Sequence, residues 1–454
     1  MLTAEDNELL CRIGPGTPMG NLLRQYWIPA LLPNELPAPD CPPMRLRMLG
    51  ENLIAFRTTS GAVGIIQNSC PHRGASLFFG RNEDEGLRCV YHGWKFDVAG
   101  ACVDMPSEPA ESNFKSKVHA KAYPTQERNG IIWTYMGPRE VPPPLPDHPG
   151  NLAPDSRVQK YVRACSFMQA LEGDIDTVHA SFLHGGHVKL EDTVPGSVDY
   201  YAVKQRWARM AVSEHEIGFT YGAYRPAEED TDCWRIGHFL LPFFTMNAPG
   251  VLTRKGGGNA YVPIDDEHVM GWRIIVPQAP EDYGKPGVGG LFEAQRRGSS
   301  LRNNQGWNQP APDTTDWIGK FRFLQNESND YMIDREAQAK NETTYTGIFG
   351  GPDPEDRAVQ ESMGGIFDRT HEHLGTTDMM IIQTRRKLLK ACEALRDHGT
   401  IPPGLDNPKL YWMFAGGAIV PRGVSGIEYT KDILFGREQV PMKEPVPQIL
   451  ASGS

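Results

Sequence analysis

The sequence predicts an α+β protein with two domains: a small all-β domain over residues 46–150, and a larger domain over residues 151–454 in which helices flank an antiparallel sheet. Three observations predict this architecture. The chain has 454 residues, more than one ordinary core holds. Short β-branched runs separated by turns fill residues 46–135. The proline-rich run 141–150 excludes helix and central strand, because proline fixes φ and lacks a backbone donor.

The expected elements follow in chain order. Residues 1–45 form a lead-in segment with one or two short helices, one of them at 22–26. The small domain has β-rich runs around turn signals, at 53–57, 63–67 and 131–135. The larger domain has further strand-like runs, at 219–224, 234–241, 261–264 and 269–276. Helical spacing of apolar residues predicts a helix at 377–395, and the polar stretch 278–315 is expected to be a long surface loop.

Composition excludes several functional classes. Hydrophobic residues make up 39% and charged residues 22% of the chain, which is typical of a soluble globular protein. The net charge of -10 argues against nucleic acid as a partner. The N-terminus lacks a secretory pattern and the longest apolar run, near 411–420, is too short for a membrane span, so we expect no membrane segment and a cytoplasmic location. The eight cysteines point to metal binding rather than to a disulfide framework.

Two short motifs each pair a cysteine with a histidine. Cys70-Pro-His72 is followed, after sixteen residues, by Cys89-Val-Tyr-His92. Two thiolates and two imidazoles could hold zinc, or they could hold a [2Fe–2S] cluster with the cysteines on one iron and the histidines on the other. The mixed halves favour the cluster, because zinc fingers usually combine a Cys-Cys half with a His-His half.

Residues 50–105 resemble a Rieske [2Fe–2S] domain, whose signature is Cys-x-His, a gap in the mid-teens, and Cys-x2-His. The resemblance implies that Cys70, His72, Cys89 and His92 hold the cluster and that the two imidazoles face the surface. A ferredoxin without enzymatic activity would account for this part of the chain only, and a zinc protein would not account for the motif described next.

A second metal-binding pattern lies at 171–186. Glu172, Asp176 and His179 stand at i, i+4 and i+7, on one face of an expected helix. His184 lies five residues later, about 140° away on a regular helix, so the helix must widen or end before both imidazoles can meet one metal. Two histidines and one carboxylate form the facial triad of non-haem Fe(II) oxygenases, which leaves positions open for O2 and substrate. Asp176 is placed to accept a hydrogen bond from a ligand histidine.

This stretch resembles the mononuclear-iron signature of Rieske oxygenase α subunits, acid-x3-Asp-x2-His-x4-His. The resemblance implies that His179 and His184 bind iron, and that Asp176 links the iron site to a Rieske histidine of a neighbouring subunit. It places Glu172 as a polar residue near the site; His187 is expected at the surface or behind the ligands.

The carboxylate ligand of the family lies far downstream, in an acidic pair followed by an amphipathic helix. Asp356 matches that description, although an aspartate there could equally cap a helix. Its competitors are the nearby acids Asp353, Asp334 and Glu355.

Most of the chain resembles the phthalate dioxygenase branch of these α subunits. The similar stretches lie at 14–21, 24–30, 107–109, 133–138 and 356–364. The resemblance implies a helix-grip catalytic domain, a Rieske [2Fe–2S] cluster with a mononuclear Fe(II), and a homotrimer or a hexamer of stacked trimers. It implies a terminal oxygenase that takes electrons from a separate NADH-dependent flavin/iron–sulfur reductase, since the chain has no dinucleotide fingerprint. The implied reaction is dihydroxylation of an aromatic carboxylate, as in phthalate 4,5-dioxygenase; the alternative is O-demethylation of a methoxylated lignin-type aromatic acid.

A carboxylate substrate calls for a cation, ideally a bidentate arginine. Arg206 and Arg209 are the candidates, with Lys204 and Arg254 behind them. On a regular strand Arg206 and Arg209 point to opposite faces, so we expect at most one of them to face the substrate.

Overall fold

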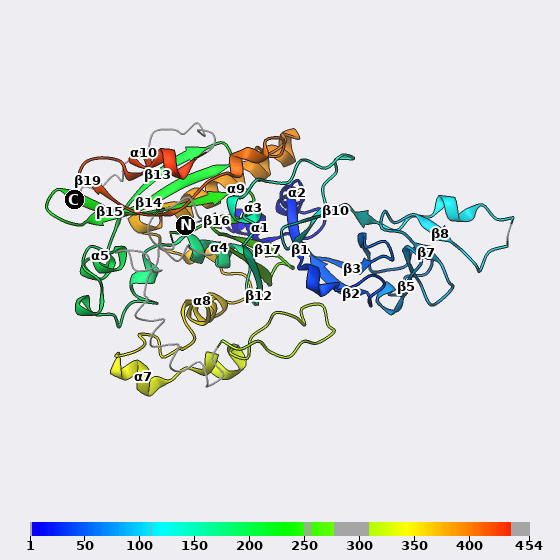
Figure 1. Cartoon of the computed structure of the whole chain (residues 1–454), viewed down its shortest axis with the longest axis horizontal. Coiled ribbons are helices and arrows are strands. Elements are labelled where there is room, and N and C mark those ends of the chain that lie inside the picture. Colours follow the sequence, from blue (N-terminus) through cyan, green and yellow to red (C-terminus); the bar gives the residue numbers. More distant parts are fainter. Residues whose placement is uncertain (1, 110, 249–251, 253–255, 277–307, 437–454) are drawn as a thin grey trace.

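The computed structural model describes residues 2–109, 111–248, 252, 256–276 and 308–436. Residues 44–123, blue to cyan in Figure 1, lie toward one end of the long axis of the molecule. The larger sheet and most of the helices occupy the other end (Figure 1).

Two four-stranded antiparallel sheets form the blue-to-cyan end. The first has the order β2-β3-β4-β9, with bounds β2 (Met44–Met48), β3 (Glu51–Arg57), β4 (Val63–Gln67) and β9 (Ala122–Tyr123). The second has the order β5-β6-β7-β8, with bounds β5 (Arg81–Glu83), β6 (Gly86–Arg88), β7 (Lys95–Phe96) and β8 (Cys102–Asp104). The hairpin predicted at 53–67 is therefore β3–β4.

A three-stranded sheet lies between this end and the large sheet. Its order is β1-β11-β10, with bounds β1 (Trp27–Leu31), β10 (Thr125–Arg128) and β11 (Ile131–Tyr135). Every residue of β1 and β11 is buried. One cluster of buried side chains runs through this sheet, and it contains Leu53 and Ile65 from the small sheet as well as Phe167 and Tyr261 from the larger part of the chain. The two parts therefore share one hydrophobic core.

The large sheet is antiparallel throughout and has the order β12-β18-β17-β16-β15-β14-β13, with β19 paired to β15 beside this path. Its strands are β12 (Arg157–Arg163), β13 (Arg209–His215), β14 (Gly218–Pro226), β15 (Thr231–Leu240), β16 (Phe244–Met246), β17 (Gly258–Pro263), β18 (Val269–Ile275) and β19 (Gly416–Pro421). The four strands predicted here correspond to β14, β15, β17 and β18.

Helices flank the large sheet. Their bounds are α1 (Ala4–Cys11), α2 (Pro18–Arg24), α3 (Pro149–Leu152), α4 (Phe167–Ile175), α5 (Val198–Lys204), α7 (Arg335–Lys340), α8 (Pro352–Glu361), α9 (Met379–His398), α10 (Gly426–Tyr429) and α11 (Lys431–Leu434). Helix α4 packs against β15 to β18, and α9, the helix predicted at 377–395, packs against β13 and β14. The predicted fold class is confirmed. None of the helices in the described ranges combines the length and the apolar character that crossing a bilayer requires.

Residues 308–324 form an arm that connects the two parts of the chain. Backbone bonds from Ala311 N to Arg322 O (2.8 Å) and from Leu324 N to Gln309 O (2.9 Å) close it. Near its tip, Trp317 packs against the small domain, where the Arg45 guanidinium lies 3.7 Å from the Phe78 ring centre and 5.6 Å from that of Trp317. The predicted loop 278–315 lies outside the described residues up to 307, and its remainder forms the first side of this arm.

Candidate metal centres and active site

The two Cys-His motifs fold into loops of the same design. Cys70 N donates to Ala75 O (2.8 Å) and Gly74 N to Cys70 O (2.9 Å); Cys89 N donates to Trp94 O (2.8 Å) and Gly93 N to Cys89 O (3.0 Å). Gly74 and Gly93 both have positive φ, at 76° and 79°, which favours glycine at the turn of each loop. The equal hydrogen bonding explains why cysteine and histidine recur with glycine at these positions.

These loops bring the four predicted cluster residues to one place. Cys70 and Cys89 are buried and interact with each other, and burial raises the pKa of Cys70 to about 11. His72 and His92 are half-buried, with ring centres 4.4 Å apart, and His72 stacks on the buried Trp94 at 4.3 Å. Paired buried thiols beside paired, partly exposed imidazoles suit a cluster that carries cysteines on one iron and histidines on the other.

Helix α4 ends earlier than the sequence predicts. Its last helical residue is Ile175, and Asp176 has extended backbone angles (φ −69°, ψ 114°). The Asp176 carboxylate accepts hydrogen bonds from Val178 N (2.8 Å) and His179 N (3.3 Å), a local turn that competes with the helix. The expectation that Glu172, Asp176 and His179 share one helical face is therefore wrong.

This turn allows both histidines to reach one point. Nε2 of His179 lies 3.2 Å from Nε2 of His184, and Oδ1 of Asp356 lies 3.4 Å and 3.2 Å from these two nitrogens. Three ligand atoms at right angles around a metal, each about 2.1 Å away, would stand about 3.0 Å apart. Among the described residues, this is the one group of three potential ligands whose atoms lie within 4.8 Å of one another. The geometry fits a facial triad with open positions.

The charges of the group suit a cation. Burial alone would lower the pKa of His179, but contacts with Asp176 and Asp356 raise it to about 10. The pKa of His184 is likewise raised against the effect of burial, chiefly by Asp356. Burial alone would raise the pKa of Asp356, but the two histidines hold it well below its usual range. A metal bound here would displace protons from both imidazoles, so its affinity should fall as the pH falls.

The other acids near Asp356 are engaged elsewhere. Asp353 binds Arg273 (3.0 Å), and Asp334 caps α7 by accepting from Ala337 N (2.8 Å). Glu355 approaches His184 at Nδ1, the nitrogen on the other side of the ring from the triad atoms. His187 is buried, and burial lowers its pKa.

Glu172 does not join the metal residues. It is buried between Arg385, whose Nε donates to Oε1 (2.7 Å), and Arg369, whose Nη2 donates to Oε2 (3.0 Å). Arg369 also donates to Asn7 Oδ1 (3.1 Å), which ties α4 to α1, while Arg385 belongs to α9. Glu172 therefore fixes the helix from which Asp176 and His179 emerge, and its position as a polar neighbour of the iron stays a prediction.

The two predicted substrate arginines have different surroundings. Arg206 precedes β13, and its guanidinium donates to the carbonyls of Ser181, Gly185 (3.0 Å) and Val188 (3.1 Å), which closes the loop that carries His184. Arg209 begins β13 and is exposed, as is Lys204. Arg254 lies outside the described residues.

Sequence reasoning missed two buried arginines, on neighbouring strands. Arg235 of β15 donates to Thr177 O (3.1 Å), two residues before His179, and to Ala248 O (3.2 Å), while its Nε has no partner. Arg225 of β14 donates from Nε to Trp207 O (3.2 Å), and one of its terminal nitrogens has no partner. In the part of the chain that the structure describes, neither is within salt-bridge distance of a carboxylate. The two arginines are two residues apart in the register of β14 and β15, so strand alternation turns them to the same face of the sheet. This alternation was the signal by which they could have been found.

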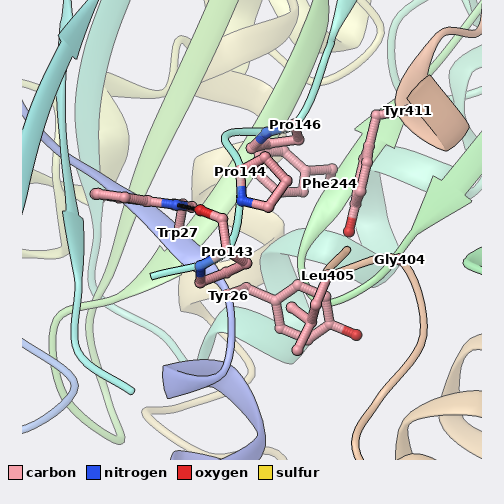
Figure 2. Close-up of a pocket in the computed structure, with 9 residues that line it drawn as sticks. All are labelled: Tyr26, Trp27, Pro143, Pro144, Pro146, Phe244, Gly404, Leu405 and Tyr411. Carbon is pink, nitrogen blue, oxygen red and sulfur yellow. Dashed lines mark hydrogen bonds between the residues drawn. The ribbon is translucent and has the colours of Figure 1, made fainter. Parts of the chain in front are cut away.

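A separate small cavity lies away from the metal residues, at the junction of β1 with the proline-rich linker (Figure 2). Its volume is about 10 Å3, and its walls include Tyr26, Pro144, Leu405 and Tyr411. Trp27 Nε1 donates to Pro143 O (2.5 Å) at its edge (Figure 2). The space holds about one water molecule, so we regard this cavity as a packing gap and not as a substrate site.

Comparison with known proteins agrees with both centres. Residues 26–124 match the Rieske [2Fe-2S] domain family, and residues 300–434 match the family described as LigXa C-terminal domain like. The oxygenase subunit of 3-chlorobenzoate-3,4-dioxygenase from Comamonas testosteroni is 42% identical over 93% of this chain and 96% of its own length. The phthalate 4,5-dioxygenase oxygenase subunit from Pseudomonas putida is 36% identical over 87% of each chain.

Two further likenesses extend the comparison. The 5,5'-dehydrodivanillate O-demethylase oxygenase subunit from Sphingobium sp. (strain NBRC 103272 / SYK-6) is 32% identical over 87% of this chain and 81% of its own. The solved structure of a Pseudomonas putida CBB5 NdmA mutant with caffeine has the same fold, with a TM-score of 0.56 at 17% identity, over 90% of this chain and 99% of the other.

These relatives are oxygenase subunits of systems that need a separate redox partner, an aromatic substrate and O2. Accordingly, the chain is an oxidoreductase whose cofactors are a Rieske [2Fe–2S] cluster and a mononuclear iron. By the extent of these similarities, the chain belongs to the Rieske non-haem iron aromatic-ring-hydroxylating oxygenases, as an α subunit of the branch that includes phthalate dioxygenase.

Proposed function

We propose that this oxygenase subunit dihydroxylates an aromatic carboxylate, in the manner of phthalate 4,5-dioxygenase, with O2 and electrons from a separate NADH-dependent flavin/iron–sulfur reductase. The observation that carries the proposal is Arg235, a buried guanidinium beside the metal residues with an unpaired nitrogen and no carboxylate partner among the described residues. Burial lowers the pKa of Arg235, because the cation lacks a counter-ion there. An anionic substrate would supply that counter-ion.

Arg225 supports a substrate with two carboxylates. Burial, together with the nearby charge of Arg235, lowers the pKa of Arg225 to about 10. Arg225 pairs in register with Cys233, and Arg235 pairs with Ala223, so both arginines lie on the same face of adjacent strands. Two buried cations that have no carboxylate within salt-bridge distance among the described residues favour a phthalate-like dicarboxylate. The names of the three relatives all contain aromatic carboxylates, which agrees with the class.

Replacing Arg235 by glutamine is expected to lower kcat/KM for aromatic carboxylates by about 30-fold to a few thousand-fold. Truncating one partner of a buried charge pair costs about 2–5 kcal/mol, and each 1.4 kcal/mol is tenfold. Steady-state O2 uptake on phthalate and on 3-chlorobenzoate measures the loss, with the exposed Arg209→Gln as the matched control. If Arg235→Gln turned over these acids like the parent, the carboxylate site would have to lie elsewhere. A loss confined to the dicarboxylate in Arg225→Gln would assign the second carboxylate to Arg225.

We assign the iron ligands to His179, His184 and Asp356, and the cluster ligands to Cys70, His72, Cys89 and His92. Iron held by the first set supplies O2 activation next to the bound substrate. Asp176 lies 3.4 Å from Nδ1 of His179, so it orients that ring with Nε2 toward the metal. Arg206 holds the loop of His184 closed, and Arg235 orients the substrate acid.

Asp176 is also the proposed contact between this site and a Rieske histidine of the next subunit, in a homotrimer or a hexamer of stacked trimers. Its side chain is 23% exposed, so it can be reached from outside. On the cluster side, Val90 and Tyr91 are 57% and 56% exposed next to His92, as a docking surface requires. Light scattering of the purified protein tests the assembly.

Replacing Asp176 by asparagine is expected to leave both metals bound and to slow turnover on the order of 10–100-fold, since partners behind metal ligands usually contribute that much. The reoxidation rate of the pre-reduced cluster, followed by its visible absorption with substrate and O2 present, measures the effect. Asp192→Asn, an exposed aspartate in the following loop, is the control. An unchanged reoxidation rate in Asp176→Asn would remove Asp176 from this role.

The second candidate reaction is O-demethylation of a methoxylated aromatic acid. It is favoured by one relative, which is named as an O-demethylase. A panel of aromatic acids with and without methoxy groups, assayed with a surrogate reductase, separates the two. Diol products support dihydroxylation, whereas formaldehyde release with a phenolic product supports demethylation.

A further inference from the structure

Helix α8 brings two adjacent carboxylates to the buried site. Asp356 points its Oδ1 to Nε2 of both histidines, whereas Glu355 places its Oε2 2.8 Å from Nδ1 of His184. Successive residues on a helix point about 100° apart, so the two acids reach opposite sides of the same imidazole ring. Glu355 is fully buried, with 0% of its surface exposed.

Glu355 is itself held in place. The hydroxyl of Thr346 donates to its Oε1 at 2.7 Å, while the other carboxylate oxygen faces His184. Thr346 belongs to a tight loop in which Ile348 N donates to the Thr346 hydroxyl oxygen (3.0 Å). The result is a chain of contacts from Thr346 through Glu355 to His184.

Of the two carboxylate contacts to a histidine Nδ1 at this site, that of Glu355 is the shorter and the less exposed to solvent. The Asp176–His179 distance is 3.4 Å with side chains 23% and 24% exposed, whereas the Glu355–His184 distance is 2.8 Å with side chains 1% and 6% exposed. With Glu355 ionised, its Oε2 accepts from Nδ1, which places the proton of neutral His184 on Nδ1. Nε2 is then left with its lone pair toward the point where the triad atoms converge.

We propose that Glu355 is a positioning residue that fixes the tautomer and the ring plane of His184 from the side of the ring opposite the metal, with Thr346 locking Glu355 in turn. The proposal rests on the ligand assignment made above. It separates the roles of the neighbouring acids: Asp356 contacts the metal, and Glu355 acts through His184.

The test uses the purified protein with its cluster intact and measures the loss of mononuclear Fe2+ to a chelator in Glu355→Gln, Thr346→Val and the double variant. Glutamine keeps the size of the side chain but removes the charge, and valine keeps the shape of threonine but removes the hydroxyl. We expect iron loss to be about 10–100-fold faster in Glu355→Gln and less accelerated in Thr346→Val. Glu361→Gln is the matched control, because Glu361 lies on the same helix but binds Tyr331 Oη (2.6 Å) and Ala164 N (2.8 Å).

The double variant distinguishes positioning from general destabilisation. If Thr346 acts only through Glu355, the double variant should lose iron no faster than Glu355→Gln alone, whereas independent structural effects would multiply. Parent-like iron loss in Glu355→Gln, or multiplied effects in the double variant, would overturn the proposal. Should Glu355→Gln fail to fold, parent-like loss in Thr346→Val would do the same.

Asp356→Ala is measured in parallel to test the ligand assignment separately. If Asp356→Ala retained iron while Glu355→Gln lost it, Glu355 would be the metal ligand. That result would overturn the ligand assignment on which the positioning role rests.

Discussion

Replacing Asp356 by alanine is expected to reduce the iron content from about three to about two per chain and to abolish turnover, while the Rieske absorption stays unchanged. The variant removes one of three ligand atoms and the charge that faces both imidazoles at 3.2–3.4 Å. The cluster loops lie on other strands and make none of these contacts, so they should be unaffected. Metal analysis with a visible spectrum of the same sample measures both centres.

Asp353→Asn is the control for Asp356→Ala. Asp353 lies on the same helix, but it pairs with Arg273 of β18. We expect this variant to keep about three irons. Full iron content in Asp356→Ala would move the third ligand to a neighbouring acid.

Replacing Glu172 by alanine is expected to cost about 3–5 kcal/mol of stability, because it leaves the Arg369 and Arg385 guanidiniums buried without their shared anion. Such a loss should lower the melting temperature by roughly 3–5 °C in a chain of this length. The same network anchors α4 to α1 and α9, so the variant should also release mononuclear iron on mild heating. Calorimetry and metal analysis after heating measure the two effects.

The Glu172 contribution should depend on pH in one direction. Burial alone would raise the pKa of Glu172, but Arg369 and Arg385 hold it below its usual value. A lowered pKa in the folded state means that the stabilisation is complete above the usual glutamate range and is lost as the pH falls toward the folded-state value. The difference between the parent and Glu172→Gln should therefore shrink in acid.

The control for Glu172 is Asp368→Asn, next to Arg369 in the chain. The Asp368 side chain is 62% exposed, and its nearest cation is His371 at 3.8 Å. Its Oδ1 accepts from Thr370 N (2.9 Å) and from the Thr370 hydroxyl (2.7 Å), and the side-chain oxygen of asparagine can accept in the same way. Its replacement should change the stability by less than about 0.5 kcal/mol. A similar small effect in Glu172→Ala would mean that the buried network adds no net stability.

Local patterns carried most of the sequence-based prediction. The spacing of Cys70, His72, Cys89 and His92 reveals the cluster loops, because each loop is a few residues long and closes on itself. Strand runs such as 63–67 and 131–135 were bounded correctly, since turns with glycine or proline flank them. The two histidines that the structure brings together with Asp356 lie in one such local pattern.

What failed depends on contacts that are distant in the chain or on side-chain capping. Helix α4 ends at Ile175 because the Asp176 carboxylate binds backbone amides, which hydrophobic periodicity does not reveal. The two arginines that bind Glu172 lie about 200 residues downstream, so their pairing with this glutamate could not be foreseen from the sequence. The closeness of Arg235 to the segment that carries His179 becomes apparent only when the fold places β15 beside Thr177.

The arm of residues 308–324 has a mechanical consequence. At its tip, Trp317 packs against the cluster domain near Phe78. At its base, the side-chain amide of Gln325 donates to Phe349 O (3.1 Å), just before helix α8. Together with the shared hydrophobic core, these contacts keep the cluster domain from moving relative to the larger domain to deliver electrons. In the proposed assembly, electron transfer would then depend on how the copies dock, and we expect a subunit isolated from its neighbours to be folded but inactive.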